Sequence, residues 1–226
     1  MSNNLAIILA RKDSKRIKNK NIINFFNKPI IYWSIKEGRK TGLFNRIIVS
    51  TDSKKIKKIS EYYGAKVPFL RSKKNSSDNA TSAEAVLETL NKIKLSKKNI
   101  YCCIMYASSP FIRSKDIKYG LNQIKKKKLS TFFQVTKVET PKHKFISIKN
   151  KTAYFNSKKF QGRSQDSMQY YRDAGQWYWI NISDFLKQKK IIMRKNNCKI
   201  LSNFKTHDIN DIEDLKVAKL KFKNYR

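Results

Sequence analysis

Short apolar segments that alternate with amphipathic ones constrain the fold of this chain more than any other feature. Residues 5–9 (LAIIL), 47–51 (IIVST) and 100–105 (IYCCIM) have the character of strands that are buried on both faces of a sheet. An amphipathic stretch follows each of the first two, and these stretches end at Gly42 and Gly64. Strands that alternate with helices in this way predict an α/β protein with a doubly wound, mainly parallel sheet.

Two further helices and another strand continue the alternation. Thr81 and Glu84 are spaced as a capping box, which predicts a helix that ends near Lys94. Ser114 is a candidate N-cap for the next helix, and residues 131–136 show the β-branched and aromatic bias of a strand. The predicted sheet therefore has at least four strands.

The alternation breaks in the later part of the chain. Residues 145–148 and 152–155 flank a Lys-Asn-Lys turn and predict a β-hairpin that leaves the main sheet. Residues 177–180 and 199–201 are expected to be further strands, and Asp211 is expected to start the last helix. The apolar residues of that helix lie roughly on one face: Ile212, Leu215, Ala218, Leu220 and Phe222.

Length and cysteine content indicate one intracellular domain. A chain of 226 residues with no internal repeat or flexible linker predicts a single domain over residues 1–226. No apolar run approaches the roughly 20 residues that span a bilayer. The three cysteines, Cys102, Cys103 and Cys198, form no CxxC pair, which is typical of thiols in a reducing compartment. The sequence therefore predicts a soluble, cytoplasmic protein with no membrane partner.

The net charge of +35 raises nucleic acid as a partner, but the composition argues against a recognition surface. Of the 51 basic residues 41 are lysine, spread through every segment, as A/T-rich codons produce without selection for a binding face. Arginine and interleaved aromatic residues, which nucleic-acid surfaces favour, are not concentrated anywhere. No specific nucleic-acid partner is expected, and a basic RNA- or DNA-binding protein stays as the alternative from another class.

The loop after the first strand is the first place to look for a ligand, because ligands of open α/β sheets collect beyond the carboxyl ends of the strands. Residues 10–21 (ARKDSKRIKNKN) place many cationic and amide side chains in this one loop. Backbone N–H groups together with Arg and Lys neutralise polyphosphates, and a solvated basic loop is the alternative interpretation. The segment is not a P-loop, because GxxxxGK[ST] is absent, and GxGxxG is absent as well.

The same loop resembles the A-R-x-G-S-K-R and K-N signature of the cytidylyltransferases that activate nine-carbon acidic sugars. The agreement continues, in one order over almost the whole chain, through six segments: 29–35 (PIIYWSI), 48–52 (IVSTD), 63–71 (YGAKVPFLR), 107–111 (ASSPF), 163–166 (RSQD) and 173–179 (DAGQWYW). The last three are most similar to the branch of the family that acts on pseudaminic acid. Several separate motifs in one order make the resemblance specific.

The resemblance implies a Rossmann-like domain of the nucleotide-diphospho-sugar transferase type. It also implies a homodimer, in which a protruding hairpin arm inserted at about residues 140–172 joins the subunits. The implied reaction is transfer of CMP from CTP to the anomeric hydroxyl of a nonulosonic acid, with release of pyrophosphate. By the same resemblance Arg11 and Lys20 hold the CTP phosphates as catalytic residues, and four residues complete the nucleotide site: Ser14, Asn21, Arg71 and Ser82.

Mg²⁺ is the implied cofactor, because a hard cation that bridges phosphate oxygens neutralises their charge and needs only one or two protein carboxylates. Asp208 matches the first acidic residue of the family's D-I-D-T-P-E-D segment and is implied to be catalytic, whereas Asn210 replaces the second. Asp211 is a candidate to supply the missing charge. Asp208 and Asp211 alternatively cap the last helix. A second departure is Asp13, which stands where the family usually has glycine and places a carboxylate beside the phosphates.

A sugar acid with amide and hydroxyl groups calls for Arg, Gln and Tyr side chains. Arg163, Gln165, Gln176 and Tyr178 lie in the matching motifs and are implied to bind it. The alternative place for Tyr178 is the core, and the alternative for Arg163 is a surface ion pair. A sialic or legionaminic acid is the alternative substrate within the same reaction class. The two departures from the family pattern leave an inactive homologue as a further alternative.

Overall fold

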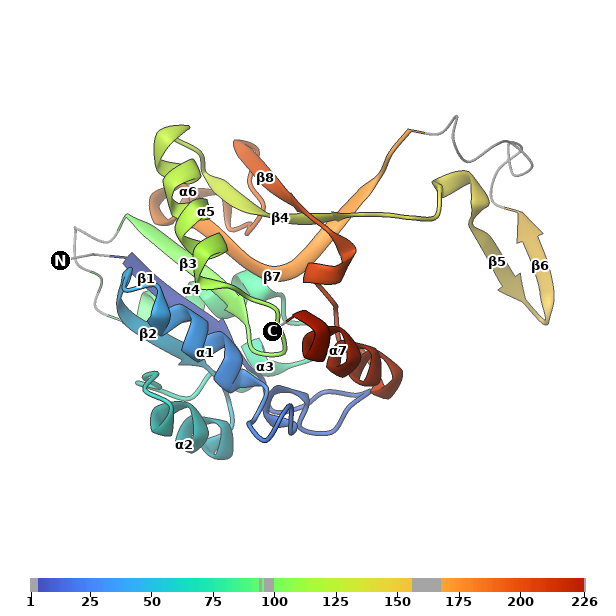
Figure 1. The fold of residues 1–226 in the computed structure, drawn as a ribbon. Coiled ribbons are helices and arrows are strands. Elements are labelled where there is room, and N and C mark those ends of the chain that lie inside the picture. Colours follow the sequence, from blue (N-terminus) through green and yellow to red (C-terminus); the bar gives the residue numbers. More distant parts are fainter. Residues whose placement is uncertain (1–3, 94, 96–99, 156–167, 226) are drawn as a thin grey trace.

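A six-stranded sheet forms the centre of the computed structural model, which describes residues 4–93, 95, 100–155 and 168–225 (Figure 1). The strand order is β2-β1-β3-β7-β4-β8. Strand β1 is parallel to β2 and β3, β4 is parallel to β8, and β7 is antiparallel to both of its neighbours. The predicted doubly wound, mainly parallel sheet is confirmed. Its strands are β1 (Asn4–Leu9), β2 (Phe44–Ser50), β3 (Tyr101–Tyr106), β4 (Thr131–Lys137), β7 (Tyr171–Asn181) and β8 (Asn196–Leu201).

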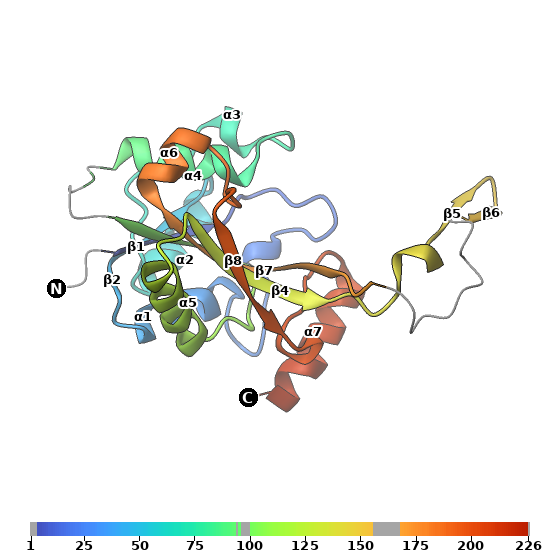
Figure 2. The same ribbon diagram turned by 90° about the horizontal axis from the view of Figure 1, so that it is seen from above.

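Helices cover both faces of this sheet. Viewed from above, α4 and α6 lie on one side and α1 and α5 on the other (Figure 2). Along β1, Leu5 and Ile7 pack toward α4, whereas Ala6 and Ile8 pack toward α1 and α5. All six residues of β1 are buried, which explains why residues 5–9 are a continuous apolar run. The helices are α1 (Ile31–Lys40), α2 (Lys54–Tyr62), α3 (Lys73–Ser76), α4 (Ser82–Lys92), α5 (Ser114–Lys126), α6 (Ile182–Gln188) and α7 (Ile212–Tyr225), with short 3₁₀ turns at Lys20–Ile22, Lys142–Lys144 and Asn203–Lys205.

The two predicted helix caps differ in outcome. The capping box of α4 is confirmed: Thr81 Oγ1 accepts from the backbone N–H of Glu84 at 3.2 Å, and Glu84 Oε2 accepts from the backbone N–H of Thr81 at 2.7 Å. The N-cap prediction for α5 is wrong, because Ser114 is the first residue of the helix and Arg113 precedes it without a side-chain cap. Instead, the Ser114 N–H donates to Glu37 Oε2 at 2.8 Å, a carboxylate carried by α1.

Helix α7 packs its apolar side on an aromatic cluster. Leu215, Ala218 and Phe222 are buried, and the Phe222 ring lies 4.9 Å from the ring centroids of both Phe25 and Trp33. The predicted apolar face was wrong for two other residues, since Ile212 and Leu220 are 49% and 67% exposed. At 100° per residue, positions 215, 218 and 222 share one stripe, whereas position 220 turns away from it.

The predicted hairpin is confirmed as a separate two-stranded sheet of β5 (Ile146–Lys149) and β6 (Thr152–Phe155). Asn150 and Lys151 both have left-handed backbone conformations, with φ of 49° and 62°, as a two-residue hairpin turn requires. All eight strand residues are exposed, and the hairpin projects far from the main sheet in both views (Figures 1 and 2). Its role in a subunit contact stays a prediction.

Within the described part of the chain, every helix is too short or too polar to cross a lipid bilayer.

Candidate active site

A cleft of about 270 Å³ opens at the carboxyl ends of β1 and β3, between the loop that follows β1 and the N-terminus of α4. Its position is the one expected for a ligand site in an open α/β sheet. Of the six residues predicted to bind the nucleotide, five line the cleft and Ser14 does not. The five lining residues are Arg11, Lys20, Asn21, Arg71 and Ser82.

Arg11 stands on the wall of the cleft and is held by the segment that precedes α4. Its Nη1 lies 3.0 Å from Asp78 Oδ1 and donates to the Ser77 carbonyl at 3.2 Å. Lys15 approaches the other carboxylate oxygen of Asp78 at 2.9 Å. The hydrogen bond from Lys15 and the charge of Arg11 hold the pKa of Asp78 below its usual range. The loop after β1 is thus closed onto residues that follow α3.

Lys20 lies at the point where the first loop meets the C-terminal segment. Its Nζ donates to the Ile209 carbonyl at 2.9 Å. Burial lowers the pKa of Lys20 below its ordinary value, Arg16 and Arg11 lower it further, and Asp208 partly opposes them. Because these neighbouring cations repel one another, a bound anion relieves the repulsion and is favoured here.

Arg71 is fixed by the end of β2. Its Nε donates to Ser50 Oγ at 3.1 Å, and its Nη2 donates to the Ser50 carbonyl. Thr89 of α4 donates to the same Ser50 hydroxyl at 3.0 Å. The Arg71 side chain is 8% exposed, and burial lowers the pKa of its guanidinium. These contacts hold the guanidinium in one place beside the cleft.

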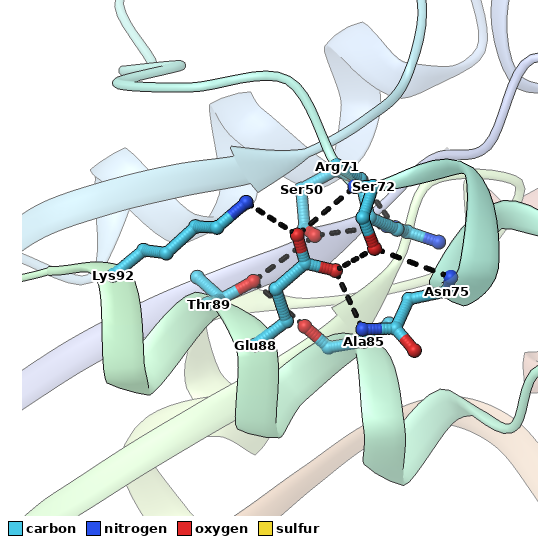
Figure 3. Close-up of polar contacts among 8 residues, drawn as sticks. All are labelled: Ser50, Arg71, Ser72, Asn75, Ala85, Glu88, Thr89 and Lys92. Atoms are coloured by element: carbon cyan, nitrogen blue, oxygen red, sulfur yellow. Dashed lines mark hydrogen bonds and ion pairs between the residues drawn. The ribbon is translucent and has the colours of Figure 1, made fainter.

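Glu88 of α4 holds the segment that carries Arg71 and α3 against the body of the protein (Figure 3). Its carboxylate accepts hydrogen bonds from the N–H and the hydroxyl of Ser72, both at 2.9 Å, and from Asn75 Nδ2 at 2.6 Å. An ion pair completes these contacts, with Lys92 Nζ 2.6 Å from Glu88 Oε1. Burial of the carboxyl favours its neutral form, but the hydrogen bonds from Lys92, Asn75 and Ser72 together outweigh it and lower the pKa of Glu88 to about 2. Glu88 therefore positions a wall of the cleft without lining it.

The predicted metal segment separates into residues with different partners. Asp208 is exposed and accepts a hydrogen bond from Asn210 Nδ2 at 2.9 Å, while Asn210 Oδ1 accepts from Arg16 at 2.8 Å. Asp211 caps α7, because its Oδ1 accepts from the backbone N–H of Asp214 at 2.8 Å. The capping alternative therefore holds for Asp211. Among the described residues, no group of three His, Cys, Asp or Glu side chains is placed to hold a metal ion.

Of the four residues predicted to bind the sugar, two are described and both face protein partners. Gln176 is 4% exposed and donates to the Lys205 carbonyl at 2.8 Å. Tyr178 is also 4% exposed, belongs to the core beneath α4, and donates its hydroxyl proton to Asp173. Neither lines the cleft, and their contact with a sugar stays a prediction. Arg163 and Gln165 lie outside the described residues.

The sequence analysis missed several residues of the cleft wall, and Tyr106 is one of them. Tyr106 ends β3, and its hydroxyl lies 3.0 Å from Ser82 Oγ. Its position at the carboxyl end of a predicted strand was the signal that could have found it. Asn75 and Ser77 belong to the stretch around α3, a single helical turn that leaves no periodic pattern in the sequence.

These observations first define a class: an α/β protein with a cleft of about 270 Å³, lined by Arg and Lys side chains, at the carboxyl edge of parallel strands. The cytidylyltransferase family model matches residues 5–225, and the chain belongs to that family. Pseudaminic acid cytidylyltransferase of Campylobacter jejuni subsp. jejuni serotype O:2 is 34% identical over 224 residues, which are 97% of this chain and 96% of that protein. N-acylneuraminate cytidylyltransferase of Escherichia coli O18:K1:H7 is 26% identical over 95% of this chain and 51% of that protein.

Solved structures share the fold. CMP:2-keto-3-deoxy-manno-octonic acid synthetase complexed with CTP matches with a TM-score of 0.73 and 14% identity, over the full length of both chains. A 4-diphosphocytidyl-2C-methyl-D-erythritol synthase from Anaerococcus prevotii matches with a TM-score of 0.63 and 13% identity, over 98% of this chain and 99% of the other. At these identities the likeness establishes the fold alone.

The hydrogen bonds of Glu88 generate a prediction about stability. Glu88→Gln removes the charge and turns an N–H₂ group toward donors, so the free energy of unfolding at pH 7 should fall by roughly 1–3 kcal/mol. Because the folded pKa is about 2 and the unfolded value about 4.5, this contribution is complete above pH 4.5 and is lost as the pH falls toward 2. Urea unfolding of both proteins at several pH values measures it.

The matched control is Glu61→Gln, because Glu61 is exposed on α2 and its Oε1 lies 3.8 Å from Lys57. That variant should change the unfolding free energy by no more than about 0.5 kcal/mol. Equal stability of Glu88→Gln and the unmodified protein at pH 7 would contradict the positioning role of Glu88.

Proposed function

We propose that this chain transfers CMP from CTP to the anomeric hydroxyl of a nonulosonic acid, with pseudaminic acid as the preferred substrate, and releases pyrophosphate. The observation that carries the proposal is the convergence of Arg11, Lys20, Asn21 and Arg71 on one cleft at the carboxyl edge of the sheet. These residues come from two segments that are remote in sequence, the loop after β1 and the stretch before α3, and were each assigned to the nucleotide from the motifs alone. Similarity over 97% of the chain to a pseudaminic acid cytidylyltransferase supports the substrate class.

In this reaction the sugar oxygen attacks the α-phosphorus in line, and charge grows on the bridging oxygen of the departing pyrophosphate. Cations that are already in place stabilise this charge without reorganisation. Arg11 and Lys20 are both restrained by hydrogen bonds to backbone carbonyls, of Ser77 and Ile209. They therefore meet the phosphates as positioned charges rather than as free surface side chains.

Mg²⁺ is the proposed cofactor, and it supplies positive charge that the phosphate oxygens share during the transfer. A site of one carboxylate suits this ion, because Mg²⁺ in phosphate chemistry is commonly held by one or two carboxylates together with the substrate. Asp208 is the proposed ligand, since it is exposed and close enough to Lys20 to influence its pKa. Asn210 bonds to Arg16 and Asp211 caps α7, so these two residues are assigned to supporting the segment.

Pseudaminic acid is preferred over other sugar acids on the strength of the relatives. A pseudaminic acid enzyme is 34% identical over 97% of the chain, whereas an N-acylneuraminate enzyme is 26% identical over 95%. A CMP-N,N'-diacetyllegionaminic acid synthase of Legionella pneumophila is 32% identical over 52% of the chain. The proposed sugar-side residues remain Arg163, Gln165, Gln176 and Tyr178. Because Gln176 and Tyr178 are buried, their proposed role is to support the residues that contact the sugar.

A homodimer is also proposed, with the β5–β6 hairpin as its arm within a single domain over residues 1–226. Ile148 and Phe155 of the hairpin are 73% and 64% exposed, and Ile146 and Tyr154 are about half exposed. An isolated two-stranded hairpin with exposed apolar side chains is stabilised when another protein surface packs against it. The cytoplasm is the proposed location, because the three cysteines form no CxxC pair, as is typical of proteins in a reducing compartment.

The direct test is incubation of the purified protein with CTP, Mg²⁺ and a panel of pseudaminic, legionaminic and sialic acids, with release of pyrophosphate as the readout. We expect the highest kcat/KM with pseudaminic acid, and no release when the sugar is omitted. Absence of turnover with every sugar would refute the proposed reaction, and faster turnover of another sugar would refute the proposed substrate.

Substitution of the phosphate-binding cations should slow the reaction. Arg11→Ala and Lys20→Ala should each lower kcat/KM at least about tenfold, because each removes a preorganised charge from the developing anion. Lys18→Ala is the matched control, since Lys18 is exposed in the same loop and does not line the cleft. If Arg11→Ala and Lys20→Ala lower kcat/KM no more than Lys18→Ala does, the proposed phosphate-binding role of Arg11 and Lys20 is refuted.

The metal assignment predicts a difference between two acidic residues three positions apart. Asp208→Asn should raise the Mg²⁺ concentration needed for half-maximal activity at least about fivefold, because a neutral amide oxygen is a weaker ligand than a carboxylate. Asp211→Asn should leave the titration midpoint in place, because Asp211 caps a helix. Identical Mg²⁺ titrations for Asp208→Asn and the unmodified protein would refute the ligand role.

A further inference from the structure

A second pocket lies between residues 22–29 and helix α2. Its volume of about 600 Å³ is within the range of pockets that bind small organic ligands. The residues that line it and the residues that line the cleft of the candidate active site are two separate sets. The second pocket is therefore distinct from the cleft, and the proposed reaction does not use it.

The walls of this pocket are mostly apolar and aromatic. Five lining residues have this character: Ile22, Pro29, Ile59, Tyr62 and Tyr63. Ile22, Ile59 and Tyr63 are partly buried and pack against the core cluster that α1 covers. Tyr62 is 83% exposed, and its ring meets the Tyr63 ring edge to face with centroids 5.0 Å apart. Aromatic and aliphatic side chains around one hollow favour a ligand with a flat, apolar body.

Two lysines give the pocket a positive charge. Lys28 stands in the segment 22–29, and Lys58 stands on α2. The Lys28 ammonium lies 5.6 Å from the centroid of the Tyr32 ring and 6.0 Å from that of the Tyr63 ring, distances at which a cation is attracted to an aromatic ring. Among the described residues that line the pocket, none is Asp or Glu. The charge of the pocket is therefore complementary to an anion.

The segment that carries Lys28 is a tight turn with a fixed shape. The Phe25 N–H donates to the Lys28 carbonyl at 2.8 Å and closes the turn. Between them Phe26 and Asn27 have left-handed backbone conformations, with φ of 53° and 58°. The Phe26 ring packs 5.1 Å from the ring of Phe222 in α7, and such contacts hold a bulky residue in this conformation. A ligand therefore meets a wall that is already formed, so little conformational entropy is lost on binding.

The apolar walls and the two cations together narrow the class of ligand. An inorganic anion leaves the apolar walls in contact with water, so it gains nothing from them. A neutral apolar ligand covers the ammonium groups without pairing them, which costs free energy. A ligand with a flat ring system and one acidic group matches both features.

We propose that this pocket binds a small aromatic anion, a planar ring system that carries a carboxylate, sulfonate or phosphate group. The ring system packs against the aromatic and aliphatic walls, and the acidic group pairs with Lys28 and Lys58. The side-chain amides of Asn24 and Asn27, which also line the pocket, offer donors and acceptors to further polar groups of the ligand.

The experiment uses a pair of fluorescent probes that differ in charge. 8-Anilinonaphthalene-1-sulfonate is an aromatic anion, and N-phenyl-1-naphthylamine is the same ring system without the sulfonate. Fluorescence titration of the full-length protein gives a Kd for each probe. We expect both to bind, and we expect saturating CTP to leave the Kd of the sulfonate unchanged, because the cleft and the pocket share no lining residue.

Two variants separate the contribution of the charge from that of the rings. Lys28→Gln should raise the Kd of the sulfonate at least about fivefold and leave the Kd of the neutral probe in place, because only the sulfonate pairs with the ammonium. Tyr62→Ala should raise the Kd of both probes at least about threefold, because it removes an aromatic wall. Lys28 and Tyr62 are both exposed, so neither change disturbs the core, and circular dichroism checks that each variant is folded.

Each variant has a matched control at a position that does not line the pocket. Lys36→Gln controls for Lys28→Gln, because the Lys36 ammonium also lies 5.7 Å from the centroid of the Tyr32 ring. Tyr154→Ala controls for Tyr62→Ala, because Tyr154 is half exposed on the β5–β6 hairpin. Both controls should keep both Kd values.

Several outcomes would overturn the inference. Displacement of the sulfonate by CTP would place the probe in the cleft, and weaker binding to Tyr154→Ala would place it on the hairpin. A Lys28→Gln variant that affects both probes equally, or the sulfonate no more than Lys36→Gln does, would remove the anion from the pocket. A protein that does not bind the sulfonate at all would also overturn it. Each of these outcomes leaves the proposed transfer of CMP standing, because that reaction is measured separately by release of pyrophosphate.

Discussion

Contacts between the two ends of the chain bring the C-terminal segment to the candidate site. Lys20 Nζ bonds the carbonyl of Ile209, which is 189 residues away and fully buried. Ile209 packs in the same cluster as Phe25 and Phe222, so the aromatic contacts that dock α7 also fix the carbonyl that Lys20 uses. Asp208 precedes this buried residue and is therefore placed beside Lys20 by packing. The candidate metal ligand and the candidate phosphate ligand depend on one hydrophobic cluster.

Burial, rather than the large net charge, distinguishes the cations of the site from the rest. Most of the 51 basic residues are solvated, where a positive charge interacts weakly with its surroundings. Lys20 and Arg71 are desolvated, and the pKa of each is lowered mainly for that reason. An anion that reaches them would meet charges that water screens less than the charges of solvated side chains. Burial therefore sets the proposed anion site apart from the lysines that occur in every segment.

Sequence patterns predicted the features whose causes are local. The apolar run of β1, the capping box at Thr81 and the hairpin turn each depend on residues within a few positions of one another. The cap of α5 failed because Glu37, which takes its place, lies 77 residues away. In the site, motifs identified the lining cations. The contact between Ser82 and Tyr106 escaped prediction because the two residues lie on α4 and β3, which only the folded sheet brings together.

The antiparallel direction of β7 explains how the arm and the site come to share one strand. The last residues of a parallel strand lie at the carboxyl edge of the sheet. Because β7 is antiparallel, its first residues lie at that edge instead, and they include Asp173 and Gln176. The β5–β6 hairpin lies in the connection from β4 to β7, so it leaves and returns at that same edge. Three separate bonds, from Gln176, Ser109 and Thr206, anchor the start of β7. The connection that carries the hairpin therefore leads into the strand whose first residues these three bonds fix.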